Sequence, residues 1–288
     1  ERRGPVHRLV MSSAFIRAQH LAPQHALSKL AGRFADSTSP WLKDRLIRRF
    51  AATYDVDMAE AERSLGEYRT FNDFFTRALK PGARPLADAA RFVLSPADGA
   101  VSQADPVANG RIVQAKGRDY SVAQLLGGDG EAAARFEGGR FATIYLSPKD
   151  YHRVHMPAAG TLKRTVYVPG DLFSVNAVTA EGVENLFARN ERLSCLFDGE
   201  LGTFASVMVG AMIVAGIATV WGGRVQPHGR TVIDAAHRDI ALGAGDEMGR
   251  FYLGSTVVLL FEAGQVEWLD TLVPGAKVRM GEAIGRRL

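Results

Sequence analysis

Cysteine is almost absent from this chain, and so are the signals of export. Cys195 is the only cysteine among 288 residues, which excludes an internal disulfide framework and a multi-cysteine zinc site. The first residues carry no apolar core, so we expect no signal peptide and interpret residues 1–10 as a tag or a disordered lead. Hydrophobic residues make up 47% of the chain, which excludes wholesale disorder.

Long apolar runs are scarce as well. Residues 204–221 carry no charge over 18 residues, which is near the lower limit for a membrane span. This stretch is rich in Val, Ile and Ala and is interrupted by Gly210 and Gly216, a composition that favours buried strands. The chain also lacks internal repeats and a His-Glu-x-x-His motif, so we expect no metal site.

Positive charge is concentrated near the start of the chain. Residues 1–50 hold ten Lys/Arg and three Asp/Glu, a net charge of +7, whereas the rest of the chain has a net charge of −3. A basic segment suits an anionic membrane surface or nucleic acid, or it is simply a solvated face. No nucleic-acid-binding motif accompanies it, so we expect no nucleic-acid partner.

The N-terminal region is expected to be helical. Apolar residues recur at helical spacing through residues 15–34, and Pro23 is expected to separate two helices there. Pro40 marks the start of a further helix, and residues 55–80 also have a helical pattern. Cationic helices with aromatic and aliphatic residues on one side either lie in a membrane interface or pack on the protein core, and the pattern alone fits both.

The pattern changes after about residue 90. Short apolar runs alternate with Gly, Pro and Asp turns, which is typical of an antiparallel sheet. These runs are residues 92–94, 112–115, 141–146, 162–168, 207–220, 256–261 and 266–269. The predicted fold class is therefore α+β, with an N-terminal helical region over residues 11–88 and an antiparallel β-rich domain over residues 89–288.

Three short motifs contain residues suited to catalysis. Asp98 lies in an Asp-Gly turn, His152 and His155 lie three residues apart, and Gly254-Ser255 begins an apolar run. Serine, histidine and aspartate together can act as nucleophile, base and orienting acid. Each motif alone is more often an ordinary turn or a structural histidine. A Gly-x-Ser-x-Gly motif is absent around Ser255, so an α/β-hydrolase is not expected.

Longer motifs make the assignment more specific. The chain resembles the bacterial phosphatidylserine decarboxylases, which are pyruvoyl-dependent, self-processing enzymes. The resemblance extends in order over roughly residues 40–270. The motifs that carry it are residues 68–75, 96–99, 114–117, 145–148, 151–157, 167–176, 185–192, 247–251 and 253–256.

This resemblance implies self-processing at the Gly254–Ser255 bond. A β chain would end at residue 254, and an α chain would comprise residues 255–288. The Ser255 hydroxyl would attack the Gly254 carbonyl, with His155 as the base and Asp98 orienting it. Elimination would then convert Ser255 into a covalent pyruvoyl group, the only cofactor expected.

The resemblance also implies a carboxy-lyase activity. Phosphatidylserine would form a Schiff base with the pyruvoyl group and lose CO2 to give phosphatidylethanolamine. A general acid must then protonate the carbon that lost CO2, and either His152 or His155 could do so. The expected assembly is a homodimer of αβ units, located peripherally on the cytoplasmic face of the bacterial inner membrane.

A lipid substrate gives the N-terminal helices a possible role. With Trp41 and Phe50, the cationic helices become the expected docking element for an anionic membrane surface. An apolar slot for acyl chains is expected beside the pyruvoyl group. Phe71, Phe74 and Phe75 are candidates for its lining, or they are core residues.

Two other classes of protein fit part of the sequence. A serine hydrolase could use Asp98, His155 and Ser255, and it would react with acylating probes without chain cleavage. A non-enzymatic β domain that binds membranes would contain no ketone. Neither class accounts for the number of motifs that match in order.

Overall fold

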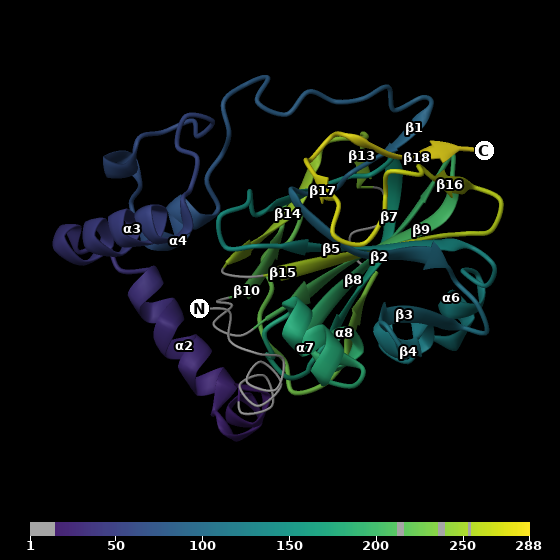
Figure 1. Ribbon diagram of the computed structural model, residues 1–288, viewed down its shortest axis with the longest axis horizontal. Helices are drawn as coiled ribbons and strands as arrows, with labels where there is room; N and C mark the ends of the chain where they lie inside the picture. Colours follow the sequence, from purple (N-terminus) through teal and green to yellow (C-terminus); the bar gives the residue numbers. More distant parts are fainter. Residues whose placement is uncertain (1–14, 212–215, 236–239, 253–254) are drawn as a thin grey trace, which may run out of the picture.

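Helices precede the strands as predicted, but the helical pattern expected over residues 55–80 is largely wrong, because only Leu65–Glu67 and Phe71–Phe75 are helical there. In this computed structural model, helices α2 to α4 form an arm beside a body built mainly of strands (Figure 1). The structure describes residues 15–211, 216–235, 240–252 and 255–288. The predicted lead at residues 1–10 lies outside the described residues, as does Gly254. The predicted α+β class with antiparallel strands is confirmed.

Prolines set two of the helix boundaries in the arm. Residues 15–21 are helical, Pro23 then precedes α2, and Pro40 begins α3, as expected of a residue with a fixed φ and no N–H. The helices are α2 (Gln24–Ala35), α3 (Pro40–Tyr54), the 3-10 turn η1 (Leu65–Glu67), α4 (Phe71–Phe75), α5 (Val122–Leu125), α6 (Gly130–Ala134), α7 (Ala177–Gly182) and α8 (Leu186–Arg189).

The strands of the body pair antiparallel. They are β1 (Phe92–Leu94), β2 (Gly99–Pro106), β3 (Arg111–Ala115), β4 (Arg118–Ser121), β5 (Arg140–Leu146), β6 (Arg153–His155), β7 (Gly160–Val168), β8 (Arg192–Gly199), β9 (Gly202–Gly210), β10 (Gly216–Thr219), β11 (Gly223–Arg224), β12 (Val232–Asp234), β13 (Ala241–Leu242), β14 (Glu247–Tyr252), β15 (Ser255–Phe261), β16 (Val266–Trp268), β17 (Lys277–Val278) and β18 (Ala283–Arg287).

The largest sheet among the described residues has the order β12-β7-β8-β9-β15-β5-β2-β17, with β13 also pairing with β7. A second sheet, β11-β10-β14-β6, carries the strand that leads toward Ser255. The described part of the uncharged stretch 204–221 lies largely in β9 and β10, as predicted. Among the described residues, no helix has both the length and the hydropathy needed to cross a membrane.

Hydrophobic cores cover both faces of the central strand β15. Val257 and Leu259 belong to one buried cluster, and Val258 and Leu260 belong to another, as the alternation of a strand buried on both sides requires. A third cluster lies in the arm and contains the aromatic residues of α4. Phe71, Phe74 and Phe75 are buried there, so the structure supports their alternative interpretation as core.

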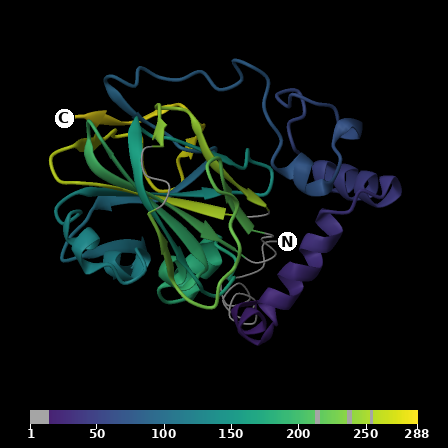
Figure 2. The ribbon, with the colours of Figure 1, turned by 180° about the vertical axis from the view of Figure 1, so that it is seen from behind.

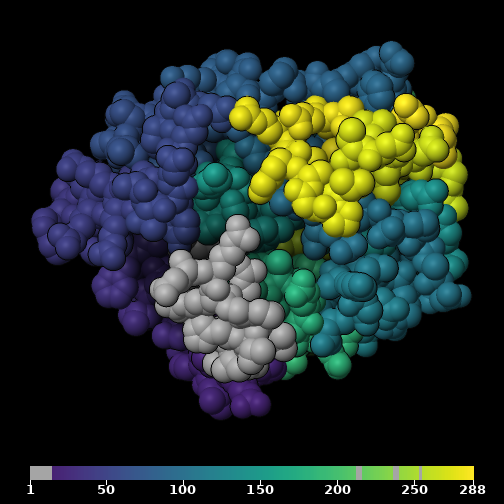
Figure 3. Space-filling view, viewed as in Figure 1, coloured from purple at the N-terminus to yellow at the C-terminus, as the bar shows by residue number. Residues whose placement is uncertain are grey.

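A long segment connects the arm to the body. After α4 the chain crosses the top of the molecule to reach β1, as Figures 1 and 2 show from opposite sides. In the space-filling view, the arm and the C-terminal segment face each other across a hollow (Figure 3).

We expect Gly99→Ala to destabilise the fold. A Cβ at this position would lie closer than 3.0 Å to the carbonyl oxygen of Tyr145 on the neighbouring strand, so β2 and β5 would have to separate. The free energy of unfolding should fall by about 1–3 kcal/mol, measured by urea denaturation. Gly66→Ala is the matched control, because nothing lies within 4 Å of a Cβ there. Equal effects of the two substitutions would contradict this packing argument.

Candidate active site

Two of the predicted site segments lie close together at the same end of neighbouring strands in the large sheet. Ser255 begins β15 and pairs with Leu146, the last residue of β5. The residue before it in β5, Tyr145, pairs with Ala100 of β2. The Asp98 turn therefore lies two strands away from Ser255. Adjacent strands are about 4.8 Å apart, so the two backbone positions are on the order of 10 Å apart.

The segment that carries His152 and His155 lies at the same end of these strands. Strand β6 pairs with β14, and the Phe251 N–H donates to the carbonyl of His152 at 3.0 Å. On its other side, the His155 N–H donates to the carbonyl of Pro96 at 2.8 Å. Strand β6 thus connects the turn that carries Asp98 to the strand that leads toward Ser255, and the four predicted residues come from neighbouring segments.

The Ser255 hydroxyl is buried and unpaired. Its side chain is fully buried, and its Oγ has no hydrogen-bond partner among the described residues. A buried hydroxyl without a partner costs about 1–3 kcal/mol, and such groups in native proteins often have a functional reason. The arrangement leaves the oxygen available for reaction.

His155 is held as a neutral base. Its Nδ1 lies 2.8 Å from the carbonyl oxygen of Gly245, which can only accept, so Nδ1 carries the proton. Its Nε2 lies 3.0 Å from the Tyr151 hydroxyl, which therefore donates to it. Burial lowers the pKa of His155 and raises the pKa of Tyr151 to about 12. At neutral pH the ring is uncharged, with the Nε2 lone pair directed at Tyr151.

Asp98 was predicted to orient His155, but its carboxylate is bound by Arg84 and Met280 instead. Arg84 donates to both of its carboxylate oxygens, at 2.9 and 3.1 Å from Nε and at 2.5 Å from Nη2. The Met280 N–H also donates to it, at 2.9 Å. No hydrogen bond joins Asp98 to His155, although both are described, so Gly245 and Tyr151 orient the ring instead. The negative charge of Asp98 still acts on His155, opposing the lowering of its pKa by burial.

His152, like Ser255, is fully buried. Its Nδ1 donates to the carbonyl of Asp150 at 2.8 Å, and its Nε2 has no partner among the described residues. The Phe75 ring packs on it with 4.0 Å between ring centroids. Burial, with a smaller contribution from the charge of Arg77, lowers its pKa to about 3. His152 is therefore neutral at neutral pH, and its Nε2 lone pair can accept a hydrogen bond.

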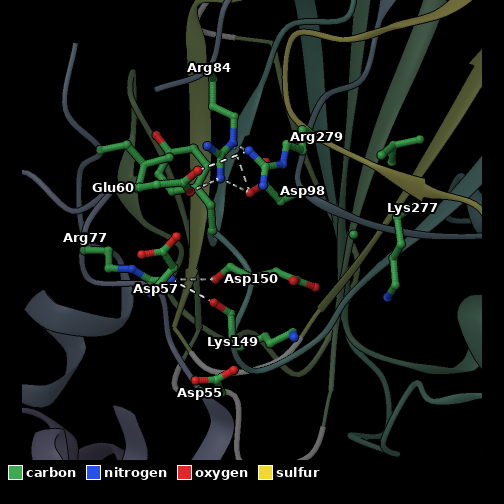
Figure 4. Close-up of a pocket in the computed structure, with 14 residues that line it drawn as sticks. Asp55, Asp57, Glu60, Arg77, Arg84, Asp98, Lys149, Asp150, Lys277 and Arg279 are labelled. Atoms are coloured by element: carbon green, nitrogen blue, oxygen red, sulfur yellow. Dashed lines mark hydrogen bonds and ion pairs between the residues drawn. The ribbon is translucent and has the colours of Figure 1, made fainter. Parts of the chain in front are cut away.

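A charged cavity of about 310 Å³ adjoins Asp98 and Tyr151. Its walls come from the arm, from the turns at residues 98–99 and 149–151, and from the C-terminal segment. Five acidic and five basic side chains line it, and Figure 4 labels all ten. Mixed charge of this kind suits a zwitterionic ligand better than a purely apolar one.

Sequence reasoning missed several neighbours of the site. Tyr151 lies inside the motif of residues 151–157, which was a usable signal, although only the structure shows its contact with His155. Glu60, Arg84 and Arg77 carry no comparable signal, because their partners are distant in the chain. Only the folded arrangement brings them to the candidate residues.

Comparison with known proteins finds similarity to one family over most of the chain. The family model described as phosphatidylserine decarboxylase matches residues 71–286, and a second one, described as PSD, matches residues 14–55. Three similar proteins are each called phosphatidylserine decarboxylase proenzyme. The one from Azotobacter vinelandii is 55% identical over 278 residues, 94% of this chain and 97% of that protein. Those from Bordetella pertussis and Pseudomonas aeruginosa are 58% identical, over 277 and 276 residues, 94% of this chain in each case and 93% and 96% of those proteins.

We predict that stability decreases in acid partly because of His152. An unfolded histidine has a pKa of about 6.5, whereas burial lowers the folded value to about 3. Between these pH values the unfolded chain binds more protons, so the free energy of unfolding falls by up to about 1.4 kcal/mol per pH unit as pH decreases. In urea denaturation from pH 7 to pH 4.5, His152→Gln should have a shallower dependence on pH than the wild type. The control is His25→Gln at an exposed position of α2, which leaves the buried ring of His152 in place. Identical slopes for the wild type and His152→Gln would contradict the prediction.

Proposed function

This chain belongs to the phosphatidylserine decarboxylase family, and we propose that it cuts itself at Gly254–Ser255 to become a pyruvoyl enzyme that converts phosphatidylserine to phosphatidylethanolamine and CO2. The observation that supports self-cleavage most directly is the buried, unpaired hydroxyl of Ser255. The relatives are named as proenzymes, which agrees with a processing step.

Self-cleavage needs a nucleophile and a base. The Ser255 Oγ attacks the carbonyl carbon of Gly254, and the neutral His155 accepts the hydroxyl proton at Nε2. Nε2 accepts from Tyr151 in the structure, so it must exchange that hydrogen bond for one from Ser255 before the attack. The peptide C–N bond then breaks as the nitrogen of Ser255 takes up a proton, leaving an ester through Oγ. Loss of the Ser255 α-proton and breakage of the Cβ–Oγ bond release a carboxylate at residue 254. Tautomerisation, addition of water and departure of ammonia leave a ketone at residue 255.

The position of Ser255 fits the pyruvoyl group that would result. Serine and the pyruvoyl group both have three carbons, and the Ser255 side chain is already buried without a committed hydrogen bond. When formed, this group supplies the electron-withdrawing ketone on which the decarboxylation depends. Because β15 is hydrogen-bonded to β5 and β9 along its whole length, the group would be held firmly at the first position of a central strand.

His152 is the better candidate for handling the substrate's protons. Its Nε2 is unpaired among the described residues, whereas the Nε2 of His155 accepts from Tyr151. Burial lowers the pKa of the free ring to about 3, which makes it a weak base. We propose that the negative charges of the bound substrate stabilise the imidazolium, so that Nε2 of His152 takes a proton from the substrate ammonium group, which must become a free amine to react. It then returns the proton to the carbon that loses CO2. The Nδ1 contact with the Asp150 carbonyl keeps the ring oriented throughout.

The charged cavity next to Asp98 is suited to the lipid headgroup. Phosphatidylserine carries an ammonium, a carboxylate and a phosphate, and the cavity offers both signs of charge. Tyr151 lines the cavity and also donates to His155. The headgroup would thus lie close to the catalytic histidine segment.

The arm presents its apolar side to the outside. In α2 the buried residues are small or polar: Gln24, Ser28, Gly32 and Ala35. Gln24 accepts from the N–H of Leu172 at 2.6 Å, so a polar face attaches this helix to the body. The apolar face is exposed instead, with exposed fractions of 43% for Leu27, 51% for Leu30 and 52% for Phe34.

This exposed face supports docking to a lipid surface. Leu21 and Trp41 are also exposed, at 86% and 71%, and Lys29 and Arg33 lie on the same helix as the apolar stripe. Apolar residues flanked by cations suit the interface of an anionic bilayer. We therefore propose that the arm places the enzyme on an anionic membrane, at the cytoplasmic face of the inner membrane. A homodimer of αβ units completes the proposed assembly.

Intact mass under denaturing conditions tests the self-cleavage. The wild type should give two species divided between Gly254 and Ser255, and the smaller one should react with a ketone reagent. Ser255→Ala should remain a single full-length species without decarboxylase activity, because it lacks the attacking oxygen. A wild type that stays uncleaved and has no ketone, but reacts with serine-directed acylating probes, would contradict the proposal and favour a hydrolase.

Vesicle binding tests the docking surface. Replacing Leu27, Leu30 and Phe34 by Gln should weaken binding to anionic phospholipid vesicles at least about 100-fold, since each buried apolar side chain contributes roughly 1.5 kcal/mol or more. The melting temperature should change little, because these side chains are exposed. The matched control replaces Ile233 and Val273, which are 61% and 52% exposed elsewhere. Unchanged binding of the triple variant would refute this assignment of the docking surface.

A further inference from the structure

Asp98 lies at the end of a chain of ion pairs. The Arg84 guanidinium contacts both oxygens of Asp98 and also donates from Nη2 to Glu60 at 2.7 Å. Glu60 accepts from Arg279 as well, at 3.1 Å. Figure 4 shows Arg84 between the two carboxylates, with Arg279 beside them. The order of contacts is therefore Asp98, Arg84, Glu60, Arg279.

The central pair of this chain is buried. The side chains of Arg84 and Asp98 are only 6% and 10% exposed. Burial lowers the pKa of Arg84, but its hydrogen bonds to Asp98 and Glu60 outweigh this and raise it above the usual range. Removing one partner from a buried pair leaves the other charge uncompensated. The Asp98 carboxylate therefore depends on Arg84 for both its position and its charge balance.

The contacts join segments that are far apart in the sequence. Glu60 belongs to the arm, Arg84 to the segment that crosses to the body, and Asp98 to the turn before β2. Arg279 and Met280 follow Ser255, so they would belong to the α chain after cleavage. Asp98 is thus held by groups from both sides of the proposed cleavage site.

We infer that Arg84 is a positioning residue for self-cleavage: supported by Glu60, it fixes both oxygens of Asp98 so that this carboxylate acts on His155 from a constant place. The inference rests on the proposed self-cleavage. A guanidinium can hold two carboxylate oxygens at once, whereas a lysine ammonium supplies only a point charge. Geometry as well as charge is therefore required at position 84.

A similar pair elsewhere in the chain serves as the matched control. Arg63 donates to both oxygens of Asp73 at 3.0 and 2.7 Å. This pair lies within the arm, it is more exposed, at 34% and 29%, and it contacts none of the four candidate site residues among the described contacts. Loss of Arg63 removes a two-pronged ion pair without removing the support of Asp98.

The test is a time course of cleavage after cell-free synthesis of the full chain. Arg84→Ala should slow cleavage roughly 100-fold, as expected when a catalytic group is displaced by about 1 Å. Arg84→Lys should cleave at an intermediate rate, and Glu60→Gln should also be slower than the wild type. Arg63→Ala should cleave at the wild-type rate. Guanidinium ion at millimolar concentration should accelerate Arg84→Ala, but not Asp98→Asn, which retains Arg84.

Folding is measured separately on uncleavable chains. The melting temperature of Arg84→Ala is compared with that of Arg63→Ala, both in the Ser255→Ala background. Wild-type cleavage by Arg84→Ala would overturn the inference. It is also overturned if neither lysine nor guanidinium restores any rate, because the loss would then reflect general damage to the fold. A wild type that never cleaves would instead refute the proposed function itself.

Discussion

The site depends on the pairing of β15 with two neighbours. All seven residues from Ser255 to Phe261 pair with both β5 and β9, and separate hydrophobic clusters cover the two faces of this strand. Ser255, which begins the strand, is consequently held at a fixed position between two neighbouring strands. If the bond before Ser255 breaks, the new chain starts inside the sheet and cannot leave unless the sheet opens. The pairing therefore both positions the reactive residue and keeps the two products together.

Burial then sets the chemistry of the surrounding groups. It keeps His152 and His155 neutral at neutral pH by lowering the pKa of each, so each ring keeps a lone pair at Nε2. It also makes the unpaired atoms costly, namely Oγ of Ser255 and Nε2 of His152. The paired strands and the cores offset that cost. Asp98 is the opposite case, because its oxygens accept from Arg84 and from the N–H of Met280. The candidate site thus combines two buried atoms that have no hydrogen-bond partner with the Asp98 carboxylate, whose two oxygens both accept hydrogen bonds.

Much of this could be predicted from the sequence, because it depends on local patterns. Pro23 and Pro40 mark helix boundaries through their fixed φ, and the apolar run 256–261 falls within β15. The site residues came from motifs in order rather than from periodicity. The role of Arg84 could not be predicted, since its contacts depend on how distant segments pack. The orientation of α2 could not be predicted either, because an amphipathic pattern does not say which face meets the body; Gln24 settles this by bonding to a backbone N–H.

The arm would therefore combine the proposed membrane docking with support of the site. Outward, α2 exposes its apolar residues. Inward, Phe75 packs on His152, and Arg77 donates to the carbonyl of Asp150, which also accepts from Nδ1 of His152. Glu60 meanwhile supports Arg84. Because the same region that would contact the bilayer also contacts the catalytic groups, the distance from the lipid surface to the site is fixed by packing within the arm. A lipid headgroup needs such a fixed distance, since its acyl chains stay in the membrane while its amine must reach a buried residue.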